Sequence, residues 1–179
     1  MDKIKNKILY LITTCEGAGA QEYLYSFLKE LKKSGDYELS LACNSKGPYY
    51  NNFFEVFDAI YKIKELKREF ALFSDLAATI KIYKIIKNNR FDLIHIQTSK
   101  ASFLGTIASK FAKNKNIVYS AHGYNSAHAT MNLLSDKFYL YLKRIIVKNS
   151  SFIAVASQTV KLLIIQFSSI FSSRINLFK

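Results

Sequence analysis

The sequence has few of the residues that interrupt or cross-link a chain. It contains one proline, six glycines and no tryptophan in 179 residues, which excludes collagen-like and linker-like segments. Its two cysteines, Cys15 and Cys43, form no Cys-x-x-Cys pair and no cluster with histidine. Neither a zinc site nor a disulfide framework is therefore indicated, and this cysteine usage fits a reducing cytoplasm.

Long apolar runs are also missing. No stretch is long enough to span a bilayer as a helix. The apolar run at 8–12 follows three lysines but is too short for the hydrophobic part of a signal peptide. Hydrophobic residues nevertheless make up 50% of the chain and aromatic residues 15%, so a buried core is expected rather than disorder.

Acidic residues are scarce in the second half of the chain. The formal net charge is +13, and residues 91–179 hold eleven Lys/Arg against two acids, Asp92 and Asp136, so this half carries +9. A field of that sign favours phosphate-bearing ligands, nucleic acid or an anionic membrane surface. The alternative is a general abundance of Lys, Ile, Asn, Tyr and Phe, as AT-rich coding produces.

Short apolar runs alternate with longer amphipathic segments along the chain. Seven segments are expected to be strands, of which the one at 37–43 alternates and the one at 59–63 is weaker: 8–13, 37–43, 59–63, 92–96, 117–121, 151–156 and 174–178. Five have helical periodicity: 20–34, 70–89, 99–113, 132–149 and 157–172. Continuous apolar strands separated by helices are typical of parallel sheets covered on both faces. We therefore expect an α/β fold with a single Rossmann-like, doubly wound and mostly parallel sheet, and residues 1–179 as one domain.

The helix expected at 99–113 has small residues at successive turns, which lets a helix lie close against a sheet. These residues are Ala101, Gly105, Ala108 and Ala112. Leu104, Ile107 and Phe111 are expected to fill the gaps beside them, and Ser99 to cap the N-terminus.

Two further helices have apolar positions at helical spacing. On the helix at 20–34, which Gly35 is placed to end, one face holds Leu24, Phe27, Leu28 and Leu31. On the helix at 70–89, the positions in register are Leu76, Ile80 and Tyr83.

The first candidate site is the glycine-rich loop between the first strand and the first helix. It contains Gly17, Gly19, Ala20 and Gln21, at a place where backbone N–H groups can approach an anion. A dinucleotide fingerprint would need glycine in place of Glu22, so that motif is absent. A tight turn with no ligand remains the alternative.

The second candidate site is a histidine at the end of the strand at 117–121. His122 precedes Gly123, and ligands of open parallel sheets bind beyond the carboxyl ends of the strands. The imidazole could contact a substrate hydroxyl or a developing charge, or it could bond a backbone carbonyl in a loop. His95, inside the strand at 92–96, is expected to be a hydrogen-bonded core histidine.

The helices near the end of the sequence suggest surfaces for partners. A basic and aromatic face of the helix at 132–149 holds Lys137, Tyr141, Arg144 and Lys148. It suits an anionic membrane surface, although a solvated face of a sheet-covering helix would have the same pattern. The helix at 157–172 is apolar nearly all round, which indicates a partner surface.

Several short motifs together resemble the N-terminal, acceptor-side half of family-four glycosyltransferases of GT-B fold. The resemblance covers essentially the whole chain and depends on the order and spacing of the motifs. In sequence order they are Ala18-Gly19-Ala20-Gln21, resembling Gly-Gly-Ala-Glu/Gln; Asp92-Leu-Ile-His95; the small positions Ala101, Gly105 and Ala108; Ser120-Ala-His122-Gly123, resembling Thr-x-His-Gly; and the strand from Ile153 to Ser157.

The resemblance implies a retaining transfer of sugar from a nucleotide-sugar, typically UDP-linked, to a glycan or lipid-linked acceptor in cell-surface polysaccharide synthesis. It implies that the Gly19 loop lies near the reaction centre and that His122 contacts the donor sugar or assists at the leaving group. Gly123, Tyr124 and Ser157 are the further substrate-binding residues. No metal, no tightly bound cofactor and no nucleic acid are expected, and the enzyme is expected in the cytoplasm, peripheral at the inner membrane face.

The resemblance also predicts what the chain lacks. In the family, a second Rossmann-like half holds most of the donor nucleotide and carries two spaced glutamates. Glu22 and Glu30 have a similar separation, but they lie in the first half and not in the donor-binding half. They are expected to lie on a solvent-exposed helix face. We therefore expect a separate donor-binding half or subunit, without which the chain is expected to be inactive.

Two other functions stay open from the residues alone. The first is a non-catalytic, basic α/β module that binds an anionic membrane or a partner chain. The second is a nicotinamide-dependent dehydrogenase, which the missing third glycine disfavours.

Overall fold

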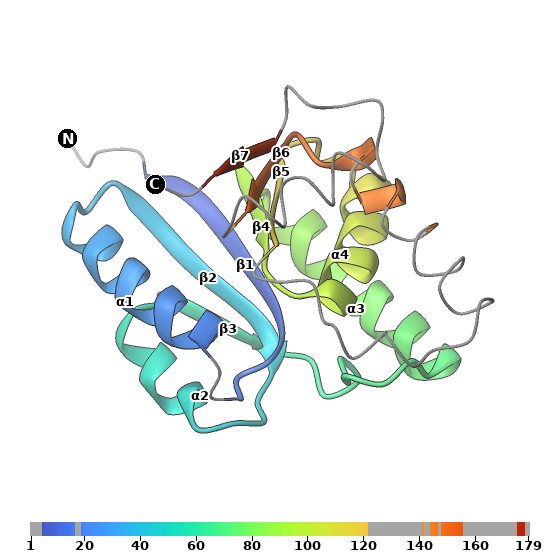
Figure 1. Ribbon diagram of the computed structural model, residues 1–179, viewed down its shortest axis with the longest axis horizontal. Coiled ribbons are helices and arrows are strands. Elements are labelled where there is room, and N and C mark those ends of the chain that lie inside the picture. Colours follow the sequence, from blue (N-terminus) through green and yellow to red (C-terminus); the bar gives the residue numbers. More distant parts are fainter. Residues whose placement is uncertain are drawn as a thin grey trace.

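A computed structural model describes residues 5–16, 19–121, 141, 144–146, 148–155 and 175–177. Within these residues the chain forms a seven-stranded sheet in which each strand pairs in parallel with its neighbours (Figure 1). The strands are β1 (Asn6–Thr14), β2 (Tyr37–Asn44), β3 (Ala59–Lys62), β4 (Leu93–Ile96), β5 (Ile117–Ala121), β6 (Phe152–Val155) and β7 (Ile175–Leu177). This confirms the expected α/β fold with a parallel, Rossmann-like sheet.

The strand order is β3-β2-β1-β4-β5-β6-β7. The chain first builds outward from β1 to β3 and then returns to the other side of β1 to add β4. The order therefore reverses between β1 and β4, which makes this pair the topological switch point of the sheet.

The helices cover both faces of the sheet. They are α1 (Gly19–Lys33), α2 (Tyr49–Asn52), the 3-10 helix η1 (Phe53–Glu55), α3 (Leu72–Asn89) and α4 (Ser99–Phe111). The bounds of α1, α3 and α4 lie within two residues of the expected ones, whereas α2 and η1 were not expected. Residues 141, 144–146, 148 and 149 are helical, within the helix expected at 132–149; the helix expected at 157–172 lies outside the described residues.

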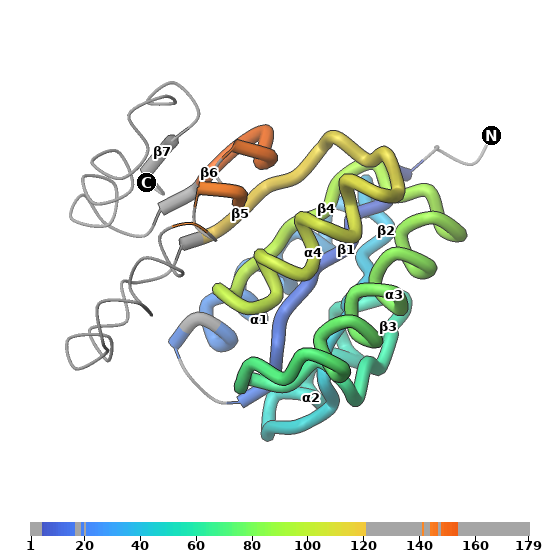
Figure 2. The backbone as a smooth tube through the Cα atoms, turned by 90° about the vertical axis from the view of Figure 1, so that its right-hand side faces the viewer, coloured from blue at the N-terminus to red at the C-terminus, as the bar shows by residue number. Residues whose placement is uncertain are grey.

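Alternate side chains of β1 enter two separate cores. Leu9 and Leu11 pack with α3 and α4 on one face, and Tyr10 and Ile12 pack with α1 and η1 on the other. Figure 1 shows α1 and α2 on one side of the sheet and α3 and α4 on the opposite side, and Figure 2 shows α3 and α4 side by side. The central strands are thus covered on both faces, which explains their continuous apolar sequence.

Helix α4 lies very close to the sheet, as its small residues predicted. A Cβ atom added to Gly105 would lie 2.4 Å from Leu11 Cδ2 and 3.0 Å from Ile96 Cδ1. Leu104 is buried, but Phe111 is 72% exposed, so the expectation that Phe111 fills a gap beside the sheet was wrong. It is the last residue of α4, and its neighbours Ala108 and Ala112 make the contact with the core there instead.

The expected Ser99 cap was also wrong. The N-cap residue of α4 is Thr98, and no side chain caps the helix there. Ser99 is already helical, and its backbone carbonyl accepts a hydrogen bond from Ser102 Oγ at 2.7 Å.

The apolar faces of α1 and α3 differ from the expected ones. In α1, Leu24 and Leu28 are buried as expected, but Phe27 is exposed and stacks on Tyr23. In α3, Leu76 and Ile80 are exposed, and the buried face consists of Ala78, Ile82 and Ile86. Gly35 follows α1 with a φ of +71°, so its predicted role in ending that helix is confirmed.

Candidate functional site at the carboxyl edge of the sheet

The carboxyl ends of β1 and β4 lie next to each other at the switch point. The two strands pair in register from Ile8 with Leu93 to Leu11 with Ile96. Beyond this register, the backbone N–H of Gln97 donates to the carbonyl of Leu11 at 3.1 Å. The residues that follow both strands are thus held side by side, at the edge where open α/β sheets bind ligands.

Two threonines meet at this edge. Thr13 Oγ1 lies 2.6 Å from Thr98 Oγ1, and the Thr13 backbone N–H donates to the same Thr98 oxygen at 3.1 Å. This explains why the Thr98 side chain leaves the α4 N-terminus uncapped. Sequence reasoning missed the pair, although each threonine comes directly at the polar end of an apolar strand.

The described part of the glycine-rich loop opens α1 beside this edge. Gly19 is exposed, and a Cβ atom added to it would meet no atom of the described residues within 4 Å. Ala20 continues the helix. Gln21 is buried, and its Nε2 donates to the carbonyl of Thr14 at 3.3 Å, which ties the first turn of α1 to the end of β1. The structure thus places Gly19 at an open position and Gln21 inward.

A short polar chain runs from β4 to β5. His95 Nε2 lies 2.6 Å from Ser120 Oγ and 3.4 Å from Gln97 Nε2. The His95 ring also contacts Tyr10, with ring centroids 4.9 Å apart. The prediction that His95 is hydrogen-bonded is confirmed, although its side chain is half-buried and not part of the core. Ser120 is fully buried. This contact therefore fixes the backbone of β5 just before the strand ends at Ala121.

Burial raises the pKa of Tyr10, whose ring lies beside His95. Tyr10 is almost entirely buried, and this burial raises its pKa far above the ordinary value. The phenol therefore stays protonated, and its place beside His95 is that of a neutral packing partner.

Several predicted site residues lie outside the described residues. These are Gly17, His122, Gly123, Tyr124 and Ser157. The structure does bring the carboxyl ends of β1 and β5 to one edge, because both strands are parallel to β4 between them. The roles of these five residues stay predictions.

The predicted membrane-contact residues are described in part. Tyr141 is 60% exposed, and Arg144 and Lys148 are exposed too, whereas Lys137 lies outside the described residues. Exposure is necessary for membrane contact, but it is equally expected of a solvated helix face, so the contact stays a prediction.

The described residues contain neither a membrane-spanning helix nor a cluster of metal ligands. No helix there combines the length and hydrophobicity needed to cross a membrane. No group of three or more His, Cys, Asp or Glu side chains there is arranged to hold a metal ion.

The sequence matches the family model of Glycosyltransferase Family 4 over residues 17–175. An Escherichia coli relative, "UDP-Gal:alpha-D-GlcNAc-diphosphoundecaprenol alpha-1,3-galactosyltransferase", is 25% identical over 118 residues, which are 66% of this chain and 29% of the relative. The match to the family model extends across the switch-point edge, from the glycine-rich loop to β7.

Solved structures share the fold. Anabaena Alr3699/HepE, in complex with UDP and glucose, superposes with a TM-score of 0.71 at 19% identity, over 96% of this chain and 44% of that one. UDP-N-acetylglucosamine 2-epimerase from Rickettsia bellii superposes with a TM-score of 0.66 at 13% identity, over 97% of this chain and 44% of that one. The chain spans less than half the length of these proteins, and at such identities the likeness shows the fold alone.

Proposed function

The chain belongs to Glycosyltransferase Family 4, and from this we propose that it is the acceptor-binding half of a retaining glycosyltransferase. The enzyme moves a sugar from a nucleotide-sugar, in the simplest case a UDP-sugar, to a glycan or lipid-linked acceptor in cell-surface polysaccharide synthesis. The family match carries the proposal. The name of the E. coli relative contains both a UDP-sugar and a diphosphoundecaprenol acceptor. It supports a nucleotide-sugar as donor and a lipid-linked glycan as acceptor.

The carboxyl edge offers the parts that acceptor binding needs. No atom of the described residues fills the space beside Gly19 at the first turn of α1, which would let a substrate approach the backbone there. Gln21 and the paired threonines hold the ends of β1 and β4 in place. We assign Gly17, Ala20, Gly123, Tyr124 and Ser157 to substrate binding around this opening.

We assign catalysis at this edge to His122, which contacts the donor sugar or assists the departing nucleotide. The hydrogen bond between His95 and Ser120 supports this assignment, because it anchors β5 just before residue 122. A neutral or protonated imidazole can stabilise charge that develops on a leaving group without any metal, and no metal is part of the proposal.

The donor nucleotide is bound elsewhere, by a separate half or subunit. The relatives are more than twice as long as this chain, and a second Rossmann-like half would close over the carboxyl edge. The chain alone is then expected to bind acceptor without transferring sugar. The proposed localisation is cytoplasmic and peripheral, at the inner membrane face. Nucleic acid is not a proposed partner.

Reconstitution tests the proposal. The chain is co-expressed with a candidate donor-binding half and incubated with a panel of UDP-sugars and GlcNAc-diphosphoundecaprenol, and UDP release is measured. We expect transfer only when both halves are present. Absence of both a complex and any transfer would contradict the proposal.

Two variants separate the site from the fold. His122→Ala is expected to lower kcat about a hundredfold or more. Gly19→Leu fills space that the fold leaves open, so it should raise KM while leaving the thermal transition unchanged. The matched control is Glu22→Leu, an exposed position on the same helix, which should change neither. If His122→Ala retains full activity in an active pair, the catalytic assignment is wrong.

A further inference from the structure

The segment between β3 and α3 lies across the carboxyl edge of the sheet. We call residues 63–71 the β3–α3 connection. Lys64 is bound to the end of β2, Arg68 to the residue just beyond the Cys that follows β1, and Glu69 to the first turn of α4, which follows β4. Because β2, β1 and β4 are neighbours in the sheet, the connection passes their carboxyl ends in that order. Arg68 therefore lies at the switch point, where open α/β sheets bind ligands.

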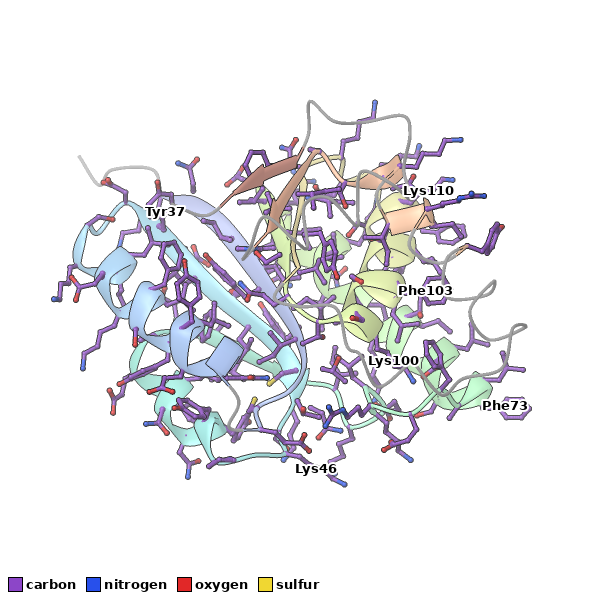
Figure 3. The ribbon with its side chains drawn as sticks, viewed as in Figure 1. Tyr37, Lys46, Phe73, Lys100, Phe103 and Lys110 are labelled. Carbon is purple, nitrogen blue, oxygen red and sulfur yellow. The ribbon has the colours of Figure 1, made fainter. Side chains whose placement is uncertain are left out.

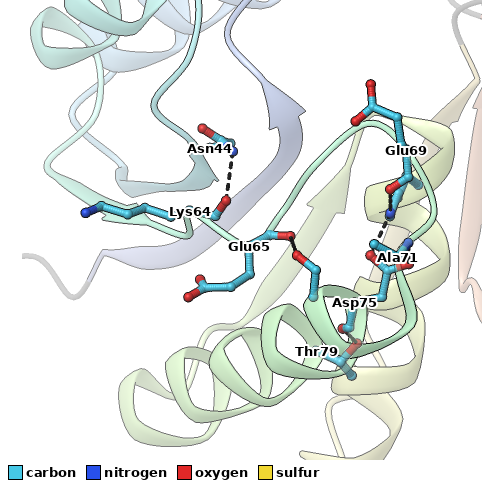
Figure 4. Close-up of polar contacts among 9 residues, drawn as sticks. Asn44, Lys64, Glu65, Glu69, Ala71, Asp75 and Thr79 are labelled. Carbon is cyan, nitrogen blue, oxygen red and sulfur yellow. Dashed lines mark hydrogen bonds and ion pairs between the residues drawn. The ribbon is translucent and has the colours of Figure 1, made fainter.

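Polar contacts fix both ends of the β3–α3 connection, as Figure 4 shows. Asn44 Nδ2 donates to the carbonyl of Lys64 at 3.1 Å. At the other end, the backbone N–H of Ala71 donates to Asp75 Oδ2 at 3.1 Å, and the buried ammonium of Lys100 pairs with Asp75 Oδ1 at 2.6 Å. The connection cannot swing away from the edge without breaking these contacts, so its middle part is held over the switch point.

Arg68, in this middle part, has one weakly bound partner. Its Nη1 donates to Glu16 Oε2 at 3.4 Å, and 73% of the Arg68 side chain and 51% of the Glu16 side chain are exposed. Ion pairs between exposed side chains contribute little to stability. A phosphate can accept two parallel hydrogen bonds from the planar guanidinium, which is a stronger arrangement than this single contact. Arg68 can therefore exchange Glu16 for a phosphate group at small cost.

A second cation is brought to the same place by a close contact between two turns. Gly47, in the turn after β2, has a φ of +117°, and a Cβ atom added to it would lie 2.2 Å from the carbonyl carbon of Cys15. The backbone N–H of Cys15 also donates to the carbonyl of Lys46 at 2.7 Å. Glycine alone permits this approach, which places Lys46 against the segment that carries Glu16.

Lys46 is exposed and forms no ion pair among the described residues. Figure 3 shows it at the outer edge of the molecule, with its side chain pointing away from the fold. With Lys67 and Arg68, three cations lie at this edge against the exposed carboxylates of Glu16 and Glu69. A singly charged anion gains little against these carboxylates, whereas a ligand with two phosphoryl groups can bind two cations at once.

We propose that Arg68 and Lys46 bind the diphosphate through which a lipid-linked acceptor carries its glycan, with Arg68 leaving Glu16 to do so. A diphosphate offers one phosphoryl group to each cation. Gly19 begins α1 only three residues after Glu16, so a glycan attached to this diphosphate lies within reach of the glycine-rich loop. The choice of the acceptor as the source of the diphosphate rests on the proposed function, in which a separate half holds the donor nucleotide.

Calorimetry with GlcNAc-diphosphofarnesol, a short-chain acceptor analogue used without a membrane, measures binding to the chain alone. Arg68→Ala is expected to weaken binding about tenfold or more. Arg68→Lys should weaken it less, because the charge stays and only the planar fork is lost, and Lys46→Ala should weaken it several-fold. The matched control is Arg90→Gly, which removes an exposed arginine at the other end of α3, where a φ of +50° suits glycine; it should leave binding unchanged.

The Glu16→Gln variant is expected to act in the opposite direction. It frees Arg68 and removes a charge that repels the ligand, so it should tighten diphosphate binding about threefold or more. Glu30→Gln is its control, since it removes the same charge from an exposed residue that pairs with Lys33, and it should have no effect. If the pair of Glu16 with Arg68 were only structural, Glu16→Gln and Arg68→Ala would change binding in the same direction. Circular dichroism verifies that each variant is folded.

Probes with one phosphate distinguish a diphosphate site from a general attraction of anions. GlcNAc-phosphofarnesol should bind about tenfold more weakly than the diphosphate analogue, and Arg68→Ala should remove most of that difference. Inorganic phosphate should compete far less well than pyrophosphate. Equal binding of the two farnesol analogues, or equal losses in Arg68→Ala and Arg90→Gly, would overturn the proposal.

The reconstituted pair separates this proposal from the proposed function. Arg68→Ala should raise KM for the lipid-linked acceptor and leave KM for the UDP-sugar unchanged. A raised KM for the UDP-sugar alone would assign the cations to the donor and contradict the proposal. Unchanged KM values in an active pair would refute the site and keep the transfer. Diphosphate binding with the expected effects of Arg68→Ala and Glu16→Gln, in a pair that transfers no sugar, would support the site and refute the transfer.

Discussion

The close approach of α4 to the sheet makes Gly105 the most sensitive small residue of the fold. In Gly105→Ala the new Cβ would lie 2.4 Å from Leu11 Cδ2, far inside ordinary van der Waals contact. The clashing atom is the end of a side chain, but Leu11 is fully buried and sits among close-packed neighbours. Its movement is therefore resisted by the core.

Two opposing effects decide the size of the change. Replacing glycine by alanine inside a helix is favourable by about 0.5–1 kcal/mol, whereas overpacking a core costs about 1–3 kcal/mol. The net effect of Gly105→Ala is a loss of about 1 kcal/mol. For a chain of this size that loss lowers the melting temperature by roughly 2–4 °C, measurable by circular dichroism. Gly105→Val, which adds two more methyl groups, should cost several times as much.

A second glycine of the same chain provides the control. Gly19 is the first residue of α1, where helix propensity counts little, and a Cβ atom added there meets nothing of the described residues within 4 Å. Gly19→Ala is therefore expected to change the free energy of unfolding by no more than about 0.5 kcal/mol. If Gly105→Ala were as stable as the native chain, with Gly19→Ala unchanged, the helix could not lie as close to β1 and β4 as described.

Two further predictions concern buried polar groups. Lys100→Met leaves the Asp75 carboxylate without its ion pair, and it should destabilise the chain by about 3–5 kcal/mol. The double variant Lys100→Met with Asp75→Leu should recover most of that loss, as measured by urea unfolding. No recovery would show that the pair does not act as a unit. Cys15 and Cys43 are buried with their sulfurs 3.4 Å apart, and the interaction with the Cys15 sulfur and burial both raise the pKa of the Cys43 thiol. A raised pKa removes thiolate at neutral pH, so alkylation of the folded chain should be slow up to pH ~9 and become fast on unfolding; rapid labelling of Cys43 in the folded chain would contradict this.

The strands could be predicted from sequence because a covered parallel sheet restricts its strands to mostly apolar residues. A strand covered on both faces favours apolar residues at every position, so β1 appears as an unbroken apolar run over residues 8–12. The same reasoning places α4, since small residues at helical spacing are explained only by a surface that the helix approaches closely. The short α2 could not be found in this way, because four residues are too few to show a helical period.

The polar contacts of the site could not be predicted, because they depend on strand order. Thr13 and Thr98 are 85 residues apart in sequence, and they meet only because β4 returns to pair with β1. Either threonine could equally have faced solvent had β4 been added outside β3. His95 was a simpler case, since a histidine inside an apolar strand needs a hydrogen-bond partner wherever the strand lies, although Ser120 could not be identified as that partner.

In α3, helical periodicity cannot decide which of two apolar faces is buried. The stripe through Leu76 and Ile80 and the stripe through Ala78, Ile82 and Ile86 have the same helical spacing, and larger side chains favour the first as the core. The structure buries the second, because α3 packs beside α4, where the smaller Ala78 permits close contact between helices. A helix that is apolar on two faces is either buried all round or in contact with something outside the fold. Lys100 fixes the first turn of α3 with the larger stripe outward, so Leu76 and Ile80, which are in register in the sequence, lie at the surface of the fold.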